Sequence, residues 1–234
     1  INAGELITLD NKNKDFFFFE KKDVRSVMGA LVYLVKTRLP EYIGASPFEI
    51  QVLTPMRKGE LGVEHLNEVL QYYLNPASES KKEKEGRTGV FREGDKVMQV
   101  KNNYKLEWKI TNAKGFSIEE GLGVFNGDMG IIKQINTYSE RITVVFDENR
   151  EAEYPFSSLD ELELAYAITI HKSQGSEYPA VVLPLLSGPP ILCNRNLLYT
   201  AITRAQKCVA IAGRQSMVCL LYTSPSPRDA HESR

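Results

Sequence analysis

The sequence predicts an α/β domain that is interrupted by a small all-β insertion. Strand-like and helix-like apolar patterns alternate over residues 1–90 and again over residues 159–218, which is typical of an α/β layer. Between them, residues 91–158 form short strand-like runs separated by turn residues, a pattern that is typical of a small barrel. Residues 219–234 are polar and rich in Ser and Pro, and we expect a disordered or non-native tail there.

The first α/β part is predicted to contain four elements. In order they are a strand over DFFFFE (Asp15–Glu20), a helix from Asp23 to Pro40, a strand over IQVLTP (Ile50–Pro55) and a helix over residues 63–73. Asp23 is suited to cap the first helix, and Pro40 is expected to end it. The following KKEKEGRTG (Lys81–Gly89) is expected to be an exposed, charged linker.

The insertion and the second α/β part follow the same logic. Four strands are expected over 95–100, 130–135, 141–146 and 151–156, with a turn at Asn126–Asp128. Residues 102–123 are less regular and fit either a long hairpin or a loop. The expected elements beyond them are strands 164–170, 180–185 and 209–212 and a helix over 195–205, for which Asn194 is a plausible cap.

Composition limits the classes of function. The formal net charge is only −1, so any nucleic-acid site must be a local patch and not a general basic field. No apolar run approaches the roughly 20 residues that a spanning helix needs, and no signal peptide is evident. The three Cys and three His residues lack metal-ligand spacing. We therefore expect a cytoplasmic protein with no membrane contact, reduced thiols and no metal site of its own.

Two strings carry most of the chemical information. ITIHKSQGSEYPAVV (Ile168–Val182) places hydroxyl, amide and backbone N–H donors at the end of an expected strand, where ligands bind in open α/β sheets. LLYTAITRAQ (Leu197–Gln206) combines a buried helical stripe with Arg204 near its end. A third string, LTPMRKGELG (Leu53–Gly62), presents Arg57 in a loop after a strand.

These strings resemble motifs V, VI and IV of superfamily 1 DNA helicases of the RecD/TraA branch, the exodeoxyribonuclease V alpha-subunit family. FREGDKVMQVKNNY and VFNGDMGII (Phe91–Tyr104 and Val124–Ile132) are similar to the SH3-like insertion of RecD-type helicases. The resemblance implies a RecA-like, P-loop NTPase-type second motor domain with an inserted SH3-like β-barrel. It also implies the activity of an ATP-dependent DNA helicase.

The resemblance also implies roles for individual residues. It implies that Arg57 and Arg204 contact the γ-phosphate of ATP as catalytic groups. It implies that Gln174, Gly175 and Glu177 also belong to the nucleotide-binding site. On the DNA side it places Thr169, His171 and Ser173, together with Lys101, Asn103 and Tyr104 from the barrel, where charge and aromatic rings suit single-stranded DNA.

The sequence contains no G-x-x-x-x-G-K-[ST] string. By resemblance, ATP and Mg²⁺ would be bound mainly by an N-terminal RecA-like domain that this chain lacks, and the chain alone would be inactive. The implied partners are that domain, single-stranded DNA and RecB/RecC-type subunits. DELE (Asp160–Glu163) looks like a magnesium-binding acid pair. Because no apolar strand precedes it, we do not interpret it as a metal site.

Other interpretations remain open from the residues alone. Arg57 fits a solvated loop cation, Arg204 a helix-surface cation paired with an acid, and His171 a structural histidine. At the level of function, the alternative is a non-catalytic nucleic-acid-binding module whose α/β part only displays the barrel. Membership of a larger conjugative relaxase-helicase is a third interpretation.

Overall fold

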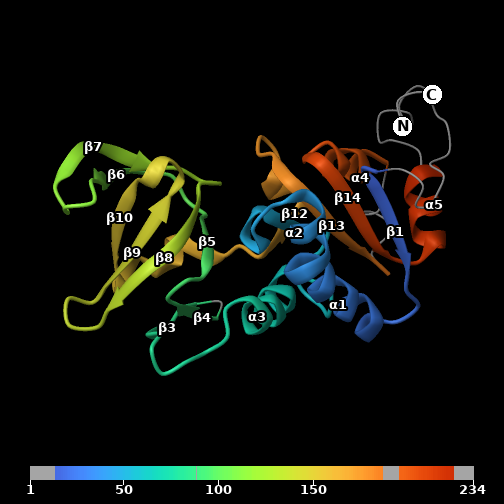
Figure 1. Ribbon diagram of the computed structural model, residues 1–234, viewed down its shortest axis with the longest axis horizontal. Helices are drawn as coiled ribbons and strands as arrows, with labels where there is room; N and C mark the ends of the chain where they lie inside the picture. The colour runs from blue at the N-terminus through green and yellow to red at the C-terminus, as the bar shows by residue number, and fades with distance from the viewer. Residues whose placement is uncertain (1–13, 88, 187–194, 224–234) are drawn as a thin grey trace, which may run out of the picture. The chain divides into compact units, whose positions relative to one another are not determined.

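A computed structural model describes residues 14–87, 89–186 and 195–223 (Figure 1). The chain divides into two compact units. Residues 1–66 and 167–234 form the first, and residues 67–166 form the second. The second unit is continuous in sequence and interrupts the first, so the predicted insertion is present. It begins within a helix, ahead of residue 91, where the sequence pattern changes.

The first unit is built on a sheet of five parallel strands. In spatial order these are β1 (Phe16–Glu20), β14 (Ala205–Gly213), β13 (Tyr178–Leu185), β2 (Ile50–Thr54) and β12 (Ala167–Thr169). Strands β2 and β13 are buried along almost their whole length, as their near-continuous apolar sequences require of strands covered on both faces. The predicted α/β class is confirmed.

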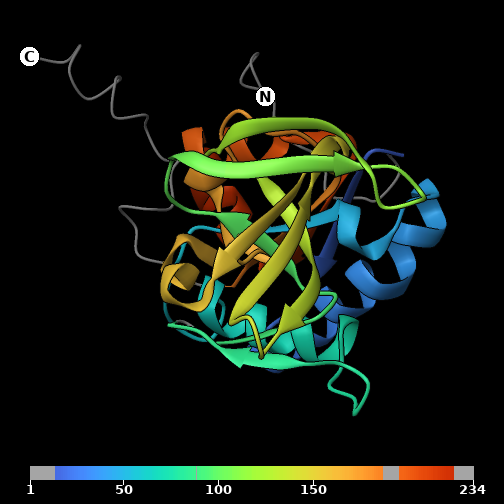
Figure 2. The same ribbon diagram turned by 90° about the vertical axis from the view of Figure 1, so that its left-hand side faces the viewer.

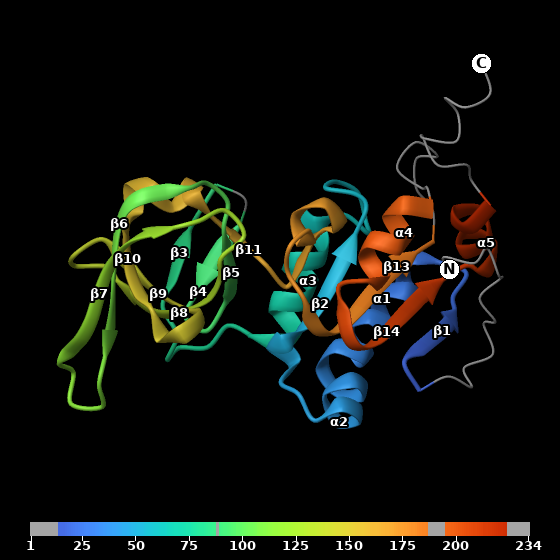
Figure 3. The same cartoon turned by 90° about the horizontal axis from the view of Figure 1, so that it is seen from above.

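Helices pack on this parallel sheet. Helix α1 (Val24–Tyr33) and helix α4 (Arg195–Ile202) both contact β13 and β14 (Figure 3), and α5 spans Gln215–Thr223. Residues 219–223 of the predicted tail are therefore helical, whereas 224–234 lie outside the described residues. The predicted cap Asn194 lies outside them as well.

The first predicted helix is longer than expected. Asp23 caps α1 as predicted, because its Oδ1 accepts a hydrogen bond from the Ser26 N–H at 2.8 Å. The predicted end at Pro40 is wrong, because a π-helical turn (Leu34–Arg38) follows α1 and leads into α2 (Leu39–Ile43). Pro40 thus lies in the first turn of α2, where the N–H that proline lacks is not needed.

The second unit is an antiparallel sheet of seven strands (Figure 2). In spatial order they are β11 (Leu162–Leu164), β5 (Lys96–Gln99), β8 (Met129–Asn136), β9 (Arg141–Phe146), β10 (Glu151–Pro155), β6 (Asn103–Thr111) and β7 (Ser117–Val124). Residues 102–123 are therefore mostly a long hairpin and not a loop. Along β9, buried and more exposed residues alternate, which places Ile142, Val144 and Phe146 in the core.

Two expectations about this region need correction. Part of the charged segment after helix α3 (Val63–Leu74) is not a linker, because β3 (Glu83–Glu85) pairs with β4 (Val90–Arg92). The single strand expected over 164–170 is also wrong. It is divided between β11, which pairs with β5, and β12, which pairs with β2, because the apolar run serves two different sheets.

A buried carboxylate joins the start and the end of the second unit. Asp95 is fully buried and accepts four hydrogen bonds, at 2.6–2.9 Å. The donors are Gln71 Nε2, Asn75 Nδ2, the Arg92 backbone N–H and the Tyr166 hydroxyl. Burial raises the pKa of Asp95 above its usual value of 3.8, and the donated hydrogen bonds act in the opposite direction. One side chain therefore ties α3, the turn before β5 and the chain after β11 together.

We predict that Asp95→Asn lowers the free energy of unfolding by about 2–4 kcal/mol. The amide NH2 group would replace one acceptor oxygen and face the N–H and O–H donors that now bind it, so buried donors would lose their partners. Denaturation with urea measures the change. The control Asp147→Asn, at an exposed position, should change stability by no more than about 0.5 kcal/mol. Equal, small losses in both variants would contradict a central role for Asp95.

Candidate nucleotide and DNA contacts

A short helical turn follows β12 and carries the predicted DNA-side residues. The Thr169 hydroxyl accepts a hydrogen bond from the Lys172 N–H at 3.3 Å and so caps the 3-10 turn Ile170–Ser173. His171 is exposed. Ser173 is fully buried, and its hydroxyl donates to the Ile170 carbonyl at 2.7 Å. Thr169 and Ser173 therefore shape the turn that displays His171.

The loop after this turn meets Arg204, which lies between α4 and β14. The Arg204 carbonyl accepts a hydrogen bond from the Tyr178 N–H at 2.8 Å, and Arg204 Nη1 donates to the Ser176 carbonyl at 3.2 Å. A second link joins Gln206 Nε2 to Glu177 Oε2 at 3.3 Å. The strings compared with motifs V and VI are therefore in direct contact.

One hydrogen-bond donor of Arg204 has no partner among the described residues. Its side chain is half-buried, and the Nε atom is buried without a hydrogen-bond partner among the described residues. Burying an unpaired donor has a cost, so such a group marks a place where a ligand can supply the missing acceptor. Beside it, Gln174, Gly175 and Glu177 are exposed, and Gly175 adopts a φ of +89° that favours glycine.

Arg57 lies in a tight loop between β2 and α3. The Thr54 hydroxyl donates to the Leu61 carbonyl at 2.7 Å, and the Val63 N–H donates to the Met56 carbonyl at 3.0 Å, so the loop folds back on itself. Arg57 Nε lies 3.6 Å from Glu64 Oε1, and both side chains are about 40% exposed. Because the pair is well solvated, it contributes little to stability.

Strand register separates these groups into two edges of the sheet. Thr54 and Thr169 are paired in parallel, so the Arg57 loop and the His171 turn both leave the carboxyl ends of their strands. Tyr178 is paired with Ala205, which places Arg204 at the amino ends. Since Ala180 is opposite Ile50, the two levels are roughly 20 Å apart at about 3.3 Å per residue. The register does not bring Arg57 and Arg204 together.

In the second unit, the predicted DNA contacts are engaged by acids. Lys101 forms an ion pair with Asp160, whose pKa it holds below the usual value, and Asn103 Nδ2 donates to Glu161 Oε2 at 3.0 Å. Tyr104 is exposed and packs edge-on against Phe125, with ring centroids 5.5 Å apart. Asp160 and Glu161 of the DELE string thus organise the base of the β6–β7 hairpin.

The described ranges contain no candidate metal-binding cluster and no candidate membrane-spanning helix. Among residues 14–87, 89–186 and 195–223, no group of three or more His, Cys, Asp or Glu side chains could hold a metal ion. We therefore derive no metal-dependent step from this chain. No helix within these ranges is long and apolar enough to cross a membrane.

Comparison with protein families matches both units. Residues 66–146 match the SH3 domain of ATP-dependent RecD-like DNA helicases, and residues 164–212 match the UvrD-like helicase C-terminal domain. This chain belongs to the RecD-like superfamily 1 helicases. It corresponds to their C-terminal part, with a RecA-like motor fold and an SH3-like insertion, as the sequence predicted.

Individual relatives agree with this family. The chain is 39% identical over 170 residues to the ATP-dependent RecD2 DNA helicase of Deinococcus radiodurans, covering 73% of this chain and 21% of the relative. It is 30% identical over 170 residues to the RecBCD enzyme subunit RecD of Mycolicibacterium smegmatis, covering 73% and 26%. The chain thus spans about a quarter or less of these relatives. A Bacteroides Pif1 structure bound to single-stranded DNA is 14% identical in sequence, with a TM-score of 0.49; the match covers 89% of this chain and 53% of the Pif1 chain.

Sequence reasoning missed several partners of the candidate residues. Ser176 acts through its backbone carbonyl, which no side-chain pattern reveals. Glu64 fits an ordinary surface acid in the first turn of α3, and nothing in the sequence predicts its ion pair with Arg57. The DELE string shows Asp160 and Glu161 as acids, but nothing in it indicates that they pair with residues about 60 positions earlier. These acids are far from Lys101 and Asn103 in the sequence, and the pairing of β11 with β5 brings the two segments together.

We predict that Gly175→Ala lowers the free energy of unfolding by about 1 kcal/mol or more, because a side chain disfavours a φ of +89° although nothing lies within 4 Å of the added carbon. Thermal unfolding measures the loss. The matched change Gly29→Ala, at an exposed position in α1 that is also open, should instead stabilise by about 0.5–1 kcal/mol. Stabilisation by both changes would disprove the strained loop.

Proposed function

We propose that this chain supplies the γ-phosphate-sensing arginine and part of the DNA path of an ATP-dependent DNA helicase. The observation that carries the proposal is the position of Arg204. It is a half-buried cation, anchored to the Ser176 carbonyl beside the Gln174–Glu177 loop, with an unpaired Nε donor. A guanidinium with one unpaired donor beside a polar loop suits the charge that develops on a transferred phosphoryl group.

Arg204 would act on ATP held by the other motor domain. In the structure its Nη1 atom donates to a neutral carbonyl, whereas a phosphate oxygen is a charged and stronger acceptor. When the nucleotide is in place, Nε and Nη1 would turn to its γ-phosphate and stabilise the transition state. Gln174 and Glu177, exposed in the same loop, would contact the nucleotide or orient the attacking water, and Gly175 would let the backbone approach closely.

The opposite edge of the sheet would hold single-stranded DNA. We assign Arg57 to this edge, in place of the γ-phosphate contact implied by motif IV, because the register groups it with Thr169 and His171. Arg57 and the exposed His171 would contact backbone phosphates, while Ser173 keeps the turn in shape. Lys101, Asn103 and Tyr104 of the barrel would add charge and a stacking surface.

The remaining machinery would come from outside this chain. ATP and Mg²⁺ would be bound mainly by an N-terminal RecA-like domain, because the sequence has no phosphate-cradling G-x-x-x-x-G-K-[ST] string. The chain alone would then be inactive in ATP hydrolysis. A RecB/RecC-type assembly is a candidate setting, since several relatives are RecBCD subunits.

In the intact helicase, we predict that Arg204→Ala lowers DNA-stimulated kcat for ATP hydrolysis by roughly 10³-fold, because the transition-state charge loses its cation. Nucleotide binding should remain largely in place. Steady-state hydrolysis and titration with a fluorescent ATP analogue separate the two effects. The control Lys207→Ala removes an exposed cation on the adjoining strand and should leave kcat unchanged. Near-normal turnover by Arg204→Ala would disprove the assignment and favour a binding module without catalysis.

We predict that Arg57→Ala weakens binding of single-stranded DNA and lowers the slope of log affinity against log salt by about 0.7, the value for one phosphate contact on a single strand. Fluorescence anisotropy of a labelled oligothymidylate at several salt concentrations measures both. Lys207→Ala, at the other edge, should keep the slope. A large fall in kcat with unchanged DNA binding would instead return Arg57 to the nucleotide.

A further inference from the structure

Exposed apolar side chains gather on the β6–β7 hairpin and its flank. Ile118 and Leu122 on β7 are 67% and 65% exposed, and Phe116, in the turn that joins the two strands, is 68% exposed. Tyr104 and Phe125 lie at the other end of the hairpin. Several large exposed apolar side chains on one hairpin are typical of an interaction site.

The free edge of β7 offers the hydrogen bonds for such an interaction. In the part of the chain that the structure describes, β7 ends the sheet and pairs only with β6. Its sequence, SIEEGLGV, contains no Lys, Arg or Pro, the residues that commonly protect edge strands. The pairing is regular from Glu107 opposite Leu122 to Ile110 opposite Glu119. The edge is therefore regular over these four pairs and carries no Lys, Arg or Pro.

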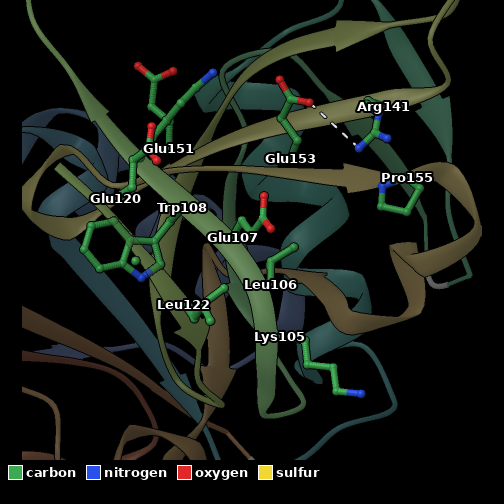
Figure 4. Close-up of a pocket in the computed structure, with 12 residues that line it drawn as sticks. Lys105, Leu106, Glu107, Trp108, Glu120, Leu122, Arg141, Glu151, Glu153 and Pro155 are labelled. Atoms are coloured by element: carbon green, nitrogen blue, oxygen red, sulfur yellow. Dashed lines mark ion pairs between the residues drawn. The ribbon is translucent and has the colours of Figure 1, made fainter. Parts of the chain in front are cut away.

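A groove of about 660 Å³ includes Glu120, Gly121 and Leu122 of β7 in its lining (Figure 4). Strands β6, β7, β9 and β10 all line it, and its apolar lining includes Leu106, Trp108 and Leu122. The Trp108 ring lies so close to Gly121 that a side chain carbon there would come within 2.3 Å of it. The groove and the centre of β7 are therefore in direct contact through one aromatic ring.

The acidic side chains near the β7 edge indicate which kind of partner can bind there. Among the glutamates of the groove, Glu153 lies 3.8 Å from Arg141 and Glu151 lies 2.6 Å from Lys133. Glu119 and Glu120 on β7 have no ion pair with any described residue. Lys109 on β6 lies directly opposite Glu120, but β7 itself carries these two acids and no cation. The edge strand therefore repels a phosphate backbone. The two acids also disfavour a second copy of β7 paired about the same residues, because like charges would then face each other.

We propose that the β7 edge binds an extended segment of a partner protein by strand addition. Side chains alternate between the two faces of a strand, so Ile118, Glu120 and Leu122 lie on one face. The segment that fits carries Lys or Arg opposite Glu120 and apolar side chains opposite Ile118 and Leu122. Backbone hydrogen bonds along the edge supply affinity, and the alternating basic and apolar residues supply specificity.

Trp108 is the only tryptophan in the chain and its ring lies against Gly121 of β7, so its fluorescence is sensitive to a segment that adds to β7. The probe is a capped octapeptide of alternating valine and lysine, titrated into the full chain, with an alternating valine–glutamate peptide as the control. We expect saturable change in Trp108 emission with the basic peptide alone. The variant Glu120→Lys should weaken binding at least about fivefold, whereas Glu79→Lys, at an exposed position in a loop, should not.

Three results would overturn the proposal. The first is no emission change with the basic peptide, or an equal change with both peptides. The second is displacement of the peptide by oligothymidylate, which would make the groove a nucleic-acid site. The third is a dimer of the peptide-free chain that Glu120→Lys dissociates, because the edge would then be occupied by a second copy. Circular dichroism of Glu120→Lys verifies that the variant is folded.

Discussion

The parallel pairing of β2, β12, β13 and β14 is the constraint on which the candidate site depends. Parallel strands place all carboxyl ends at one edge of a sheet and all amino ends at the other. The Arg57 loop and the His171 turn therefore share one edge, and Arg204 lies at the opposite one. Residues 170–177 connect the end of β12 to the start of β13, so a single short segment joins both edges. In the proposed helicase, this segment would be the physical link between DNA contact and nucleotide contact.

The barrel unit depends on a different interaction. Asp95 holds the helix that enters the unit, the turn before β5 and the chain that leaves β11, through four donors from four different residues. Because these donors come from both ends of the insertion, the unit closes on itself. The β6–β7 hairpin extends beyond this closed part and keeps one strand edge open. A fixed base with an open edge suits a module that binds a partner without unfolding.

Much of this arrangement was predictable from the sequence, because local patterns determined it. The Asp23 cap, the buried strand β2 and strands β5, β8, β9 and β10 of the insertion follow from periodicity and turn residues. The continuation past Pro40 was not predictable, since a π-helical turn leaves no sequence signal of its own. The division of residues 164–170 between two sheets, and the edge at which Arg57 lies, depend on strand order. Strand order is a property of tertiary pairing, and the motif string around Arg57 carries no information about it.

The most direct test is a structure of the intact helicase with ADP–aluminium fluoride and single-stranded DNA. We predict that Arg204 leaves the Ser176 carbonyl and lies within about 2.7–3.2 Å of the aluminium fluoride, at hydrogen-bonding distance. We also expect Arg57 and His171 to lie against the DNA backbone. An Arg204 that stays on Ser176 while Arg57 contacts the fluoride would contradict the separation of the two edges and the role assigned to each arginine.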